Sequence, residues 1–402
     1  MPSSPIFFGK SFLNRVSYLR TDEKFLRQSL EFPHTVFVPF CKGEAFAISN
    51  DDDTTRGPDL YTLTLNEGSQ LFKKYVTEYA SVLNKPEARA ALTGVSLTFL
   101  GIDQSPEIDS VKLLVYTTRG ASETNTMKTY SGQPYYAINF HKETQASLGF
   151  PRGSLTRMTR PVLMSLNNKS ATLYSHAMMY IDWLSKQRFC PSCGHPIYTI
   201  HGGTKLQCSN TDPSVECSLR DMRLNNLCFP RTDPTIIVLM TNRSFDKVCL
   251  VRTKRRIDDV HVMYSNVAGF MEPGETVETA CVREIWEETG VLCNEKNVSI
   301  LMTQPWPTPA NLMIGCVAVV EFNGSNELVS FDNDDELLDA KWFDTRDVLV
   351  ALDKYSELSE DARESLGFFV PFRDNIYLPG KVALAHYLLE HLVDEYKRRN
   401  GH

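Results

Sequence analysis

A stretch between residues 269 and 291 constrains the fold of this chain most, because it encodes a turn followed by a helix with an acidic side. Pro273 and Gly274 favour the turn, and Thr276 is a suitable N-cap residue. Gly290 stands where a left-handed residue commonly ends a helix. We therefore predict a loop followed by a helix over residues 277–289.

Three glutamates give this predicted helix its chemistry. At about 100° per residue, Glu284 and Glu288 lie on the same side as the apolar Val277 and Cys281, and Glu287 lies one step around. A bare pair of glutamates on a helix is usually a solvated face. Carboxylates beside core positions, however, repel each other unless a divalent cation neutralises them. Mg²⁺ or Mn²⁺ prefers such ligands and completes its shell with substrate phosphate, which predicts metal-assisted attack of water on a phosphoanhydride.

Arg283 lies within reach of these carboxylates. It can pair with Glu287 at the i+4 position, or with Glu275 across the loop, and either pairing would hold a carboxylate in place. The sequence leaves both alternatives open.

Four cysteines predict a second metal site, of a different kind. Cys190 and Cys193 form a C-x2-C knuckle, and Cys208 and Cys217 follow it. Four thiolates suit the closed tetrahedral geometry of structural Zn²⁺, which leaves no position for catalytic water. His195 could replace one ligand, but with four cysteines at hand a solvated histidine is the better interpretation. The alternative is a set of four buried or exposed thiols without metal.

Length and composition point to several soluble domains. The chain has 402 residues, which is more than one hydrophobic core usually organises. Of these residues 42% are hydrophobic and 23% charged, an ordinary globular composition. Its longest apolar run, about residues 312–320, is too short to cross a bilayer, so we expect no membrane partner. Residues 1–229 hold 24 basic and 20 acidic residues, against 18 and 29 in residues 230–402. The acidic second part disfavours a phosphate-tracking surface there and is compatible with cation binding.

Apolar patterns predict the elements around these motifs. Strands are expected at 36–40, 97–100 and 111–116, with a loop at 118–133 and helices at 71–79 and 171–185. Beyond residue 234 we expect strands at 235–240, 248–251, 298–302, 312–322 and 340–343, and a closing helix from residue 381 to about 398. The fold class is α+β, with an N-terminal α+β domain at 1–187, the cysteine segment at 188–229 and a C-terminal domain at 230–402.

The acidic stretch resembles the Nudix box, G-x5-E-x7-R-E-U-x-E-E-x-G-U with U apolar, and matches it at every specified position. The resemblance implies the Nudix fold, a mixed sheet between helices, and hydrolysis of a nucleoside diphosphate linked to another group. It also implies that Glu284, Glu287, Glu288 and the carbonyl of Ala268 bind the catalytic Mg²⁺ or Mn²⁺. Glu288 or Glu287 is then the residue that activates water.

A second motif, Thr303-Gln-Pro-Trp-Pro-Thr-Pro-Ala-Asn311, narrows the family. A Trp among three prolines makes a rigid platform for stacking on a flat ring, although a packed loop would explain it too. The motif is similar to the S-Q-P-W-P-F-P-x-S sequence of NADH pyrophosphatases, which also carry a zinc ribbon directly before the Nudix domain. Thr303, Thr308 and Asn311 depart from that pattern, and the missing Phe at 308 puts the shape of the nucleotide pocket in question.

The same resemblance, closest to fungal members, extends to other site positions. Glu336 matches the remote metal-binding glutamate. The positions that match substrate contacts are Phe229, Phe270, Gln304, Pro305, Trp306, Pro307, Thr308, Pro309, Ala310, Asn311 and Ala383. Family members are typically homodimers, and Trp286, predicted to face away from the carboxylates, would suit a domain or subunit contact.

The leading hypothesis is therefore hydrolysis of the pyrophosphate of NAD(H) to AMP and nicotinamide mononucleotide, the reduced form being preferred. One alternative is removal of NAD caps from RNA, with Arg252, Lys254, Arg255 and Arg256 as a basic rim. The other is a zinc-ribbon binding module with a non-catalytic Nudix scaffold. Fungal relatives are often peroxisomal through a C-terminal tripeptide. This chain ends in Arg399-Asn-Gly-His402, so we expect a cytoplasmic location, with the peroxisome as the alternative.

Overall fold

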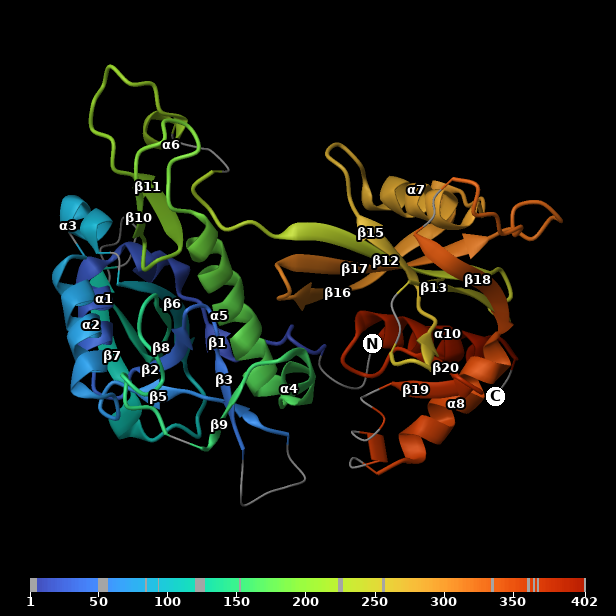
Figure 1. Cartoon of the computed structure of the whole chain (residues 1–402), viewed down its shortest axis with the longest axis horizontal. Helices are drawn as coiled ribbons and strands as arrows, with labels where there is room; N and C mark the ends of the chain where they lie inside the picture. Colours follow the sequence, from blue (N-terminus) through green and yellow to red (C-terminus); the bar gives the residue numbers. More distant parts are fainter. Residues whose placement is uncertain are drawn as a thin grey trace. The chain divides into compact units, whose positions relative to one another are not determined.

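The structure, a computed structural model, describes residues 6–49, 57–83, 85–92, 94–119, 127–151, 153–222, 227–254, 257–333, 336–359, 362–363, 366 and 369–400. The chain forms two compact units, Lys10–Arg231 and a second unit made of Met1–Gly9 with Thr232–His402 (Figure 1). The expected segments 1–187 and 188–229 thus fall into one unit, apart from the first residues, which join the C-terminal unit. None of the described helices is both long and apolar enough to cross a membrane.

The Lys10–Arg231 unit is built on a six-stranded sheet of order β1-β6-β8-β2-β5, in which β7 also pairs with β8. Strand β2 runs parallel to β8, and the other pairs are antiparallel. The strands of this sheet are β1 (Leu13–Asn14), β2 (Val36–Cys41), β5 (Leu63–Thr64), β6 (Val95–Asp103), β7 (Leu114–Arg119) and β8 (Met127–Phe140). A three-stranded sheet joins β3 (Phe46–Ile48), β4 (Asp59–Leu60) and β9 (Leu155–Arg157).

Helices bury their apolar faces against this larger sheet. Phe25 of α1 and Phe72 of α2 share one core with Phe37, Phe99 and Tyr136 of the strands, and α5 packs against β6 and β8. The helical segments are η1 (Ser17–Thr21), α1 (Glu23–Glu31), α2 (Gln70–Ser81), α3 (Pro86–Ala91), η2 (Ser110–Lys112), α4 (Arg160–Ser165) and α5 (Asn168–Lys186). The cysteine segment adds the hairpin β10 (Ile197–Ile200) and β11 (Lys205–Cys208), followed by α6 (Ser218–Asp221).

The C-terminal unit is a mixed sheet between helices, as predicted. The strand order is β16-β17-β12-β13-β18, with β15 beside β12, and β12 runs parallel to β17. Alternation along β12 divides the core: Ile236 and Val238 face α7, whereas Ile237 and Leu239 face α8 and α10. The strands are β12 (Asp233–Asn242), β13 (Lys247–Thr253), β15 (Val267–Phe270), β16 (Val298–Trp306), β17 (Asn311–Val320) and β18 (Leu337–Asp344).

The remaining elements of this unit cover the two faces of its sheet. A small sheet joins β14 (Val262–Met263), β20 (Ile376–Leu378) and β19 (Val370–Arg373). The helical segments are α7 (Val277–Thr289), η3 (Glu295–Asn297), α8 (Thr345–Glu357) and α10 (Leu384–Asn400).

Two local predictions were wrong. Residues 110–112 form a 3-10 turn rather than the start of a strand. The Val111 side chain is exposed, so it does not pack into a hydrophobic core. Residues 127–133 were expected in a loop but belong to β8, in which residues 127–132 pair with β7 and Gln133 pairs with Asp103 of β6. Residues 118–119 of that predicted loop belong to β7, and residues 120–126 lie outside the described residues.

Candidate active site and zinc site

Helix α7 begins and ends at the predicted residues because both of its ends are capped locally. The backbone N–H of Thr279 donates to Oγ1 of Thr276 at 3.2 Å. At the other end Gly290 has a φ of 70° and donates to the carbonyl of Trp286. The loop before the helix closes through the N–H of Glu272, which donates to Oε2 of Glu275 at 2.8 Å. These caps fix the register in which the glutamates project.

Arg283 binds Glu275 and Glu287 at once, so the two pairings left open by the sequence coexist. Its Nε and Nη2 donate to the two oxygens of Glu275 at 2.6 and 2.9 Å. Its Nη1 donates to Glu284 at 2.8 Å and to Glu287 at 3.0 Å, and Nη2 also reaches the carbonyl of Phe270 at 2.9 Å. Hydrogen bonds from Arg283 lower the pKa of Glu275. The arginine thus ties α7, its preceding loop and the end of β15 together.

The glutamates differ in burial as the helical angles predict. Glu288 is 5% exposed and the Glu284 side chain 12%, whereas the Glu287 side chain is 41% exposed. Burial raises the pKa of Glu284 above its usual value; the charges of Glu287 and Glu336 act in the same direction and Arg283 opposes them. This interaction brings Glu336, just before β18, into the field of the α7 carboxylates.

Gly269 is the site residue whose role sequence reasoning missed. A Cβ at this position would lie 2.2 Å from the carboxylate carbon of Glu284, so β15 approaches the helix more closely than any side chain permits. Ala268, the predicted carbonyl ligand, is the next residue of this strand. The glycine of the motif is therefore required by a contact with its own glutamate.

We expect Gly269→Ala to displace the Glu284 carboxylate and weaken Mn²⁺ affinity by roughly 10–100-fold, the usual cost of disturbing a residue that orients a metal ligand. Mn²⁺ titration followed by electron paramagnetic resonance measures this, and the Tm reports whether the fold persists. Unchanged Mn²⁺ affinity in a folded variant would show that Glu284 is not a ligand.

The residues of α7 fit divalent cations by the chemistry of their donors. The buried Glu284 carboxyl, whose pKa is raised by burial and by the charges of Glu287 and Glu336, gains from a bound cation, and oxygen ligands suit Mg²⁺ or Mn²⁺. The glutamate oxygens are spread more widely than the cysteine sulfurs. Among the described residues, the cysteines alone form a group of three or more metal-ligating side chains within 4.8 Å of one another.

The second motif forms the end of β16, the turn after it and the start of β17, and its Gln304 has a supporting position. The Gln304 side chain is fully buried; its Nε2 donates to the carbonyls of Phe7 and Val382, and its Oε1 accepts from the N–H of Leu384 at 2.8 Å. These bonds flank Ala383, so the structure brings this motif and Ala383 together. Gln304 has no exposed surface for the predicted substrate contact and instead holds the surrounding backbone.

The other predicted contact residues range from buried to exposed. Trp306 is half-buried and packs edge-on against Phe8, with ring centroids 5.7 Å apart. Nδ2 of Asn311 donates to Thr235, and its buried Oδ1 has no partner among the described residues. Pro307 is buried, Pro305, Ala310 and Ala383 are half-buried, and Thr308, Pro309 and Phe270 are exposed. Phe229 is exposed in the other unit, under the ammonium group of Lys205.

The four cysteines converge as the zinc hypothesis requires. Sulfur–sulfur distances are 3.6 Å between Cys190 and Cys217 and 3.4 Å between Cys193 and Cys208. A tetrahedron with Zn–S bonds of about 2.3 Å has edges of about 3.8 Å, so the site fits the ion. A backbone N–H of His195 lowers the pKa of Cys193 to about 6, which favours the thiolate. The His195 side chain is exposed and outside this group, so it does not replace a ligand.

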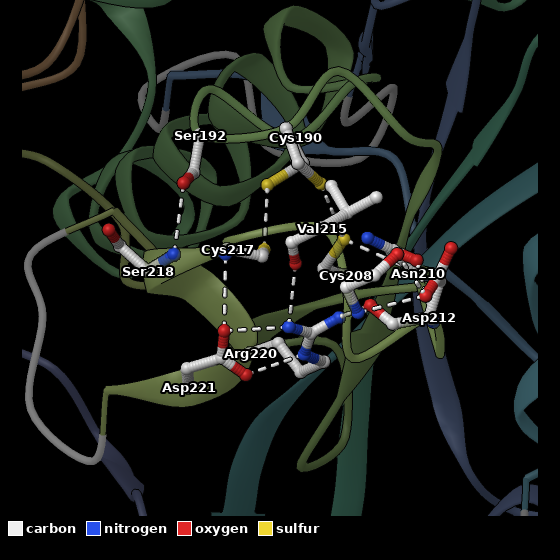
Figure 2. A network of polar contacts seen from close by, with 12 residues as sticks. Cys190, Ser192, Cys208, Asn210, Asp212, Val215, Cys217, Ser218, Arg220 and Asp221 are labelled. Atoms are coloured by element: carbon white, nitrogen blue, oxygen red, sulfur yellow. Dashed lines mark hydrogen bonds and ion pairs between the residues drawn. The ribbon is translucent and has the colours of Figure 1, made fainter.

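Arg220 and Asp221 brace the zinc site, as Figure 2 shows. The Asp221 carboxylate accepts the N–H of Cys217 at 3.1 Å. Arg220 binds that carboxylate with two nitrogens, and its guanidinium also donates to the carbonyls of Asp212 and Val215. The ion pair between Arg220 and Asp221 thus fixes the chain segment that joins Cys208 to Cys217.

Comparisons with known proteins identify the two domains that carry these sites. A NUDIX domain model matches residues 231–364, and an NADH pyrophosphatase zinc ribbon domain model matches residues 185–213. The chain is 42% identical to NAD-capped RNA hydrolase NPY1 of Saccharomyces cerevisiae, over 99% of this chain and 97% of that protein. It is 30% identical to NAD-capped RNA hydrolase of Schizosaccharomyces pombe, over 88% and 87%.

A human protein with a name of the same kind is also similar to this chain. NAD-capped RNA hydrolase NUDT12 of Homo sapiens is 30% identical over 96% of this chain and 73% of that protein. These relatives are named as hydrolases, which argues against the hypothesis of a binding module with a non-catalytic Nudix scaffold. With an intact acidic helix and a four-cysteine ribbon before it, this chain is a Nudix hydrolase of the NADH pyrophosphatase family.

Proposed function

We propose that this enzyme hydrolyses the central pyrophosphate of NAD-type dinucleotides and releases AMP and nicotinamide mononucleotide, with the reduced cofactor preferred. The observation that carries the proposal is the placement of Glu284 and Glu288 on the buried side of α7, with Glu284 against Gly269. Buried carboxylates this close to a strand fit cation-assisted phosphoryl chemistry better than they fit a solvated helix face.

Different residues of the site would bind the metal, accept the proton of water and hold the substrate. Glu284, Glu287, Glu288, Glu336 and the Ala268 carbonyl would hold Mg²⁺ or Mn²⁺, which when bound acidifies water and stabilises charge on phosphoryl oxygens. Glu288, or the more exposed Glu287, accepts the proton of the attacking water. The exposed ring of Phe270 and the half-buried Trp306 would stack on the bases, while Arg283 keeps the acidic side chains in register.

A second candidate substrate is the NAD cap of RNA, in which the same bond is broken. The names of the relatives from yeasts and human favour it. Of the basic rim predicted for RNA access, Arg255 and Arg256 lie outside the described residues. Both substrates contain the pyrophosphate bond that the enzyme is proposed to break.

Product analysis with Mn²⁺ tests the proposal. We expect AMP from NADH and NAD⁺, a higher kcat/KM for NADH than for NAD⁺, and lower activity with ADP-ribose and diadenosine polyphosphates. NAD-capped RNA should yield 5′-monophosphorylated RNA. Absence of AMP from every dinucleotide, at full zinc content and native Tm, would refute the function.

We propose one structural Zn²⁺ per chain, a homodimer in which the exposed Trp286 suits a subunit contact, and a cytoplasmic location. Elemental analysis, analytical ultracentrifugation and imaging of a tagged chain measure these.

A further inference from the structure

A cavity of about 570 Å³ lies within the Lys10–Arg231 unit, and none of its described lining residues belongs to the acidic helix. Its walls come from α2, α3 and the residue after it, β6, the residues after β8, the end of α5 with the residues that follow, and β10 of the cysteine hairpin. We call it the ribbon pocket. Its volume falls within the range of roughly 300–1,000 Å³ that is usual for small-molecule sites and exceeds what one water cluster needs.

The lining of the ribbon pocket is cationic. Arg89, Lys142 and Arg188 line it, and no Asp or Glu is found among its described lining residues. None of these three cations forms an ion pair with a carboxylate in the described part of the chain. Burial and then the charge of Arg188 lower the pKa of His141, which lines the same pocket. An uncompensated positive field in a concave site attracts polyanions.

Aromatic rings interleave with these charges. Tyr198 and Phe189 line the pocket, and the Phe189 ring is 63% exposed although it directly precedes the zinc ligand Cys190. A large exposed ring next to a rigid metal knuckle is available for stacking without loss of much side-chain freedom. Cations that hold phosphates beside rings that stack on bases are the general composition of single-stranded nucleic-acid sites.

The charged lining continues beyond the ribbon pocket. A second cavity of about 260 Å³ shares Arg89 and Tyr198 with it and adds Arg20 and His201. Nε of Arg20 is buried without a hydrogen-bond partner in the described residues, and Glu23 is the acid found in this second lining. Two adjoining basic cavities with an arginine and a tyrosine in common suit a ligand longer than one nucleotide.

We propose that the ribbon pocket binds a single-stranded RNA segment, through phosphates on Arg89, Lys142 and Arg188 and a base on Phe189. The proposal rests on the capped-RNA form of the proposed function, because it assigns a binding site for the RNA body rather than for the dinucleotide. A free mononucleotide offers the same phosphate and base chemistry, so the test separates the two ligands.

The test measures binding of a 12-nucleotide, 5′-fluorescein RNA to the full zinc-loaded chain by anisotropy, without added Mg²⁺ or Mn²⁺, between 50 and 200 mM salt. Each lost phosphate contact lowers the salt slope by about 0.7 for a single strand. The double variant Lys142→Gln/Arg188→Gln should therefore lose about 1.4 in slope, or roughly 25-fold in affinity at 0.1 M salt. Phe189→Ala should lose roughly tenfold with little change in slope.

Lys112→Gln is the matched control, because Lys112 is an exposed lysine of the same unit and lines neither cavity. It should bind RNA like the unchanged chain, and all variants should hydrolyse NADH at the same kcat/KM. The RNA-site proposal is overturned if the double variant binds RNA normally, or if AMP competes for the site as tightly as the 12-mer does. Loss of RNA affinity in a chain that cleaves no dinucleotide would refute the proposed function and leave this site standing.

Discussion

Replacing Glu288 with glutamine is expected to lower kcat for NADH hydrolysis by roughly 10²–10⁴-fold, the contribution typical of a general base. Glutamine has nearly the same shape, but it neither accepts the proton of water nor carries the charge that binds a cation. Glu288 is only 5% exposed and lies on the inner side of α7. AMP release at saturating Mn²⁺ measures the effect.

Glu278→Gln provides the matched control for this prediction. Glu278 lies in the first turn of the same helix, before the acidic cluster, so the same chemical change should leave kcat within about twofold. If Glu288→Gln retained most of its activity while Glu287→Gln lost it, the proton-accepting role would belong to Glu287. Loss of activity in Glu278→Gln to the same extent would mean that the assay reports helix stability instead of catalysis.

The second large effect is expected at the cysteine cluster. Cys217→Ser should reduce bound zinc from one equivalent to a small fraction and unfold the segment around β10 and β11, because apparent zinc binding supplies roughly 10–16 kcal/mol in small zinc domains. Cys217 is fully buried and belongs to a small cluster with Trp183, Leu184 and Leu206, which offers little core of its own. Elemental analysis and the near-ultraviolet thiolate bands of the Co²⁺-substituted chain measure ligation, and thermal unfolding measures the loss of structure.

Cys228→Ser separates metal ligation from simple burial. Cys228 is 2% exposed in the same hydrophobic cluster but does not belong to the four-sulfur group. Its serine variant should keep one equivalent of zinc and the tetrahedral Co²⁺ spectrum. Full zinc content in Cys217→Ser would contradict the assigned ligand set.

The acidic helix was predictable because its determinants are local. Thr276, Gly290 and the spacing of the glutamates act within a few turns, and the structure places α7 at the predicted residues. The same holds for the cysteine knuckle, whose ligands are close in sequence. The strand β8 was not predicted, and its first half was expected in a loop, because the polar residues there are ordered by pairing with β7, which no local apolar pattern reveals.

Long-range contacts explain what the sequence could not predict at the site. Gln304 is bound to the carbonyl of Phe7, 297 positions away, so its supporting role follows only from the folded chain. Gly269 carries a second example. The motif alone does not say why a glycine stands at this position, whereas in the structure the Glu284 carboxylate lies where a Cβ would be.

The bond between Gln304 and Phe7 has a consequence for how this enzyme is made. Because Met1–Gly9 belongs to the same unit as Thr232–His402, residues 10–231 are topologically an insertion that leaves and re-enters the catalytic body at two covalent junctions. During synthesis the ribosome therefore makes the N-terminal residues long before the residues that they contact. The inserted unit is complete before α10, the last helix of the C-terminal unit, has been synthesised. A fragment that starts at Thr232 would lack Phe7 and Phe8 and leave the amide of Gln304 and the ring of Trp306 without these neighbours.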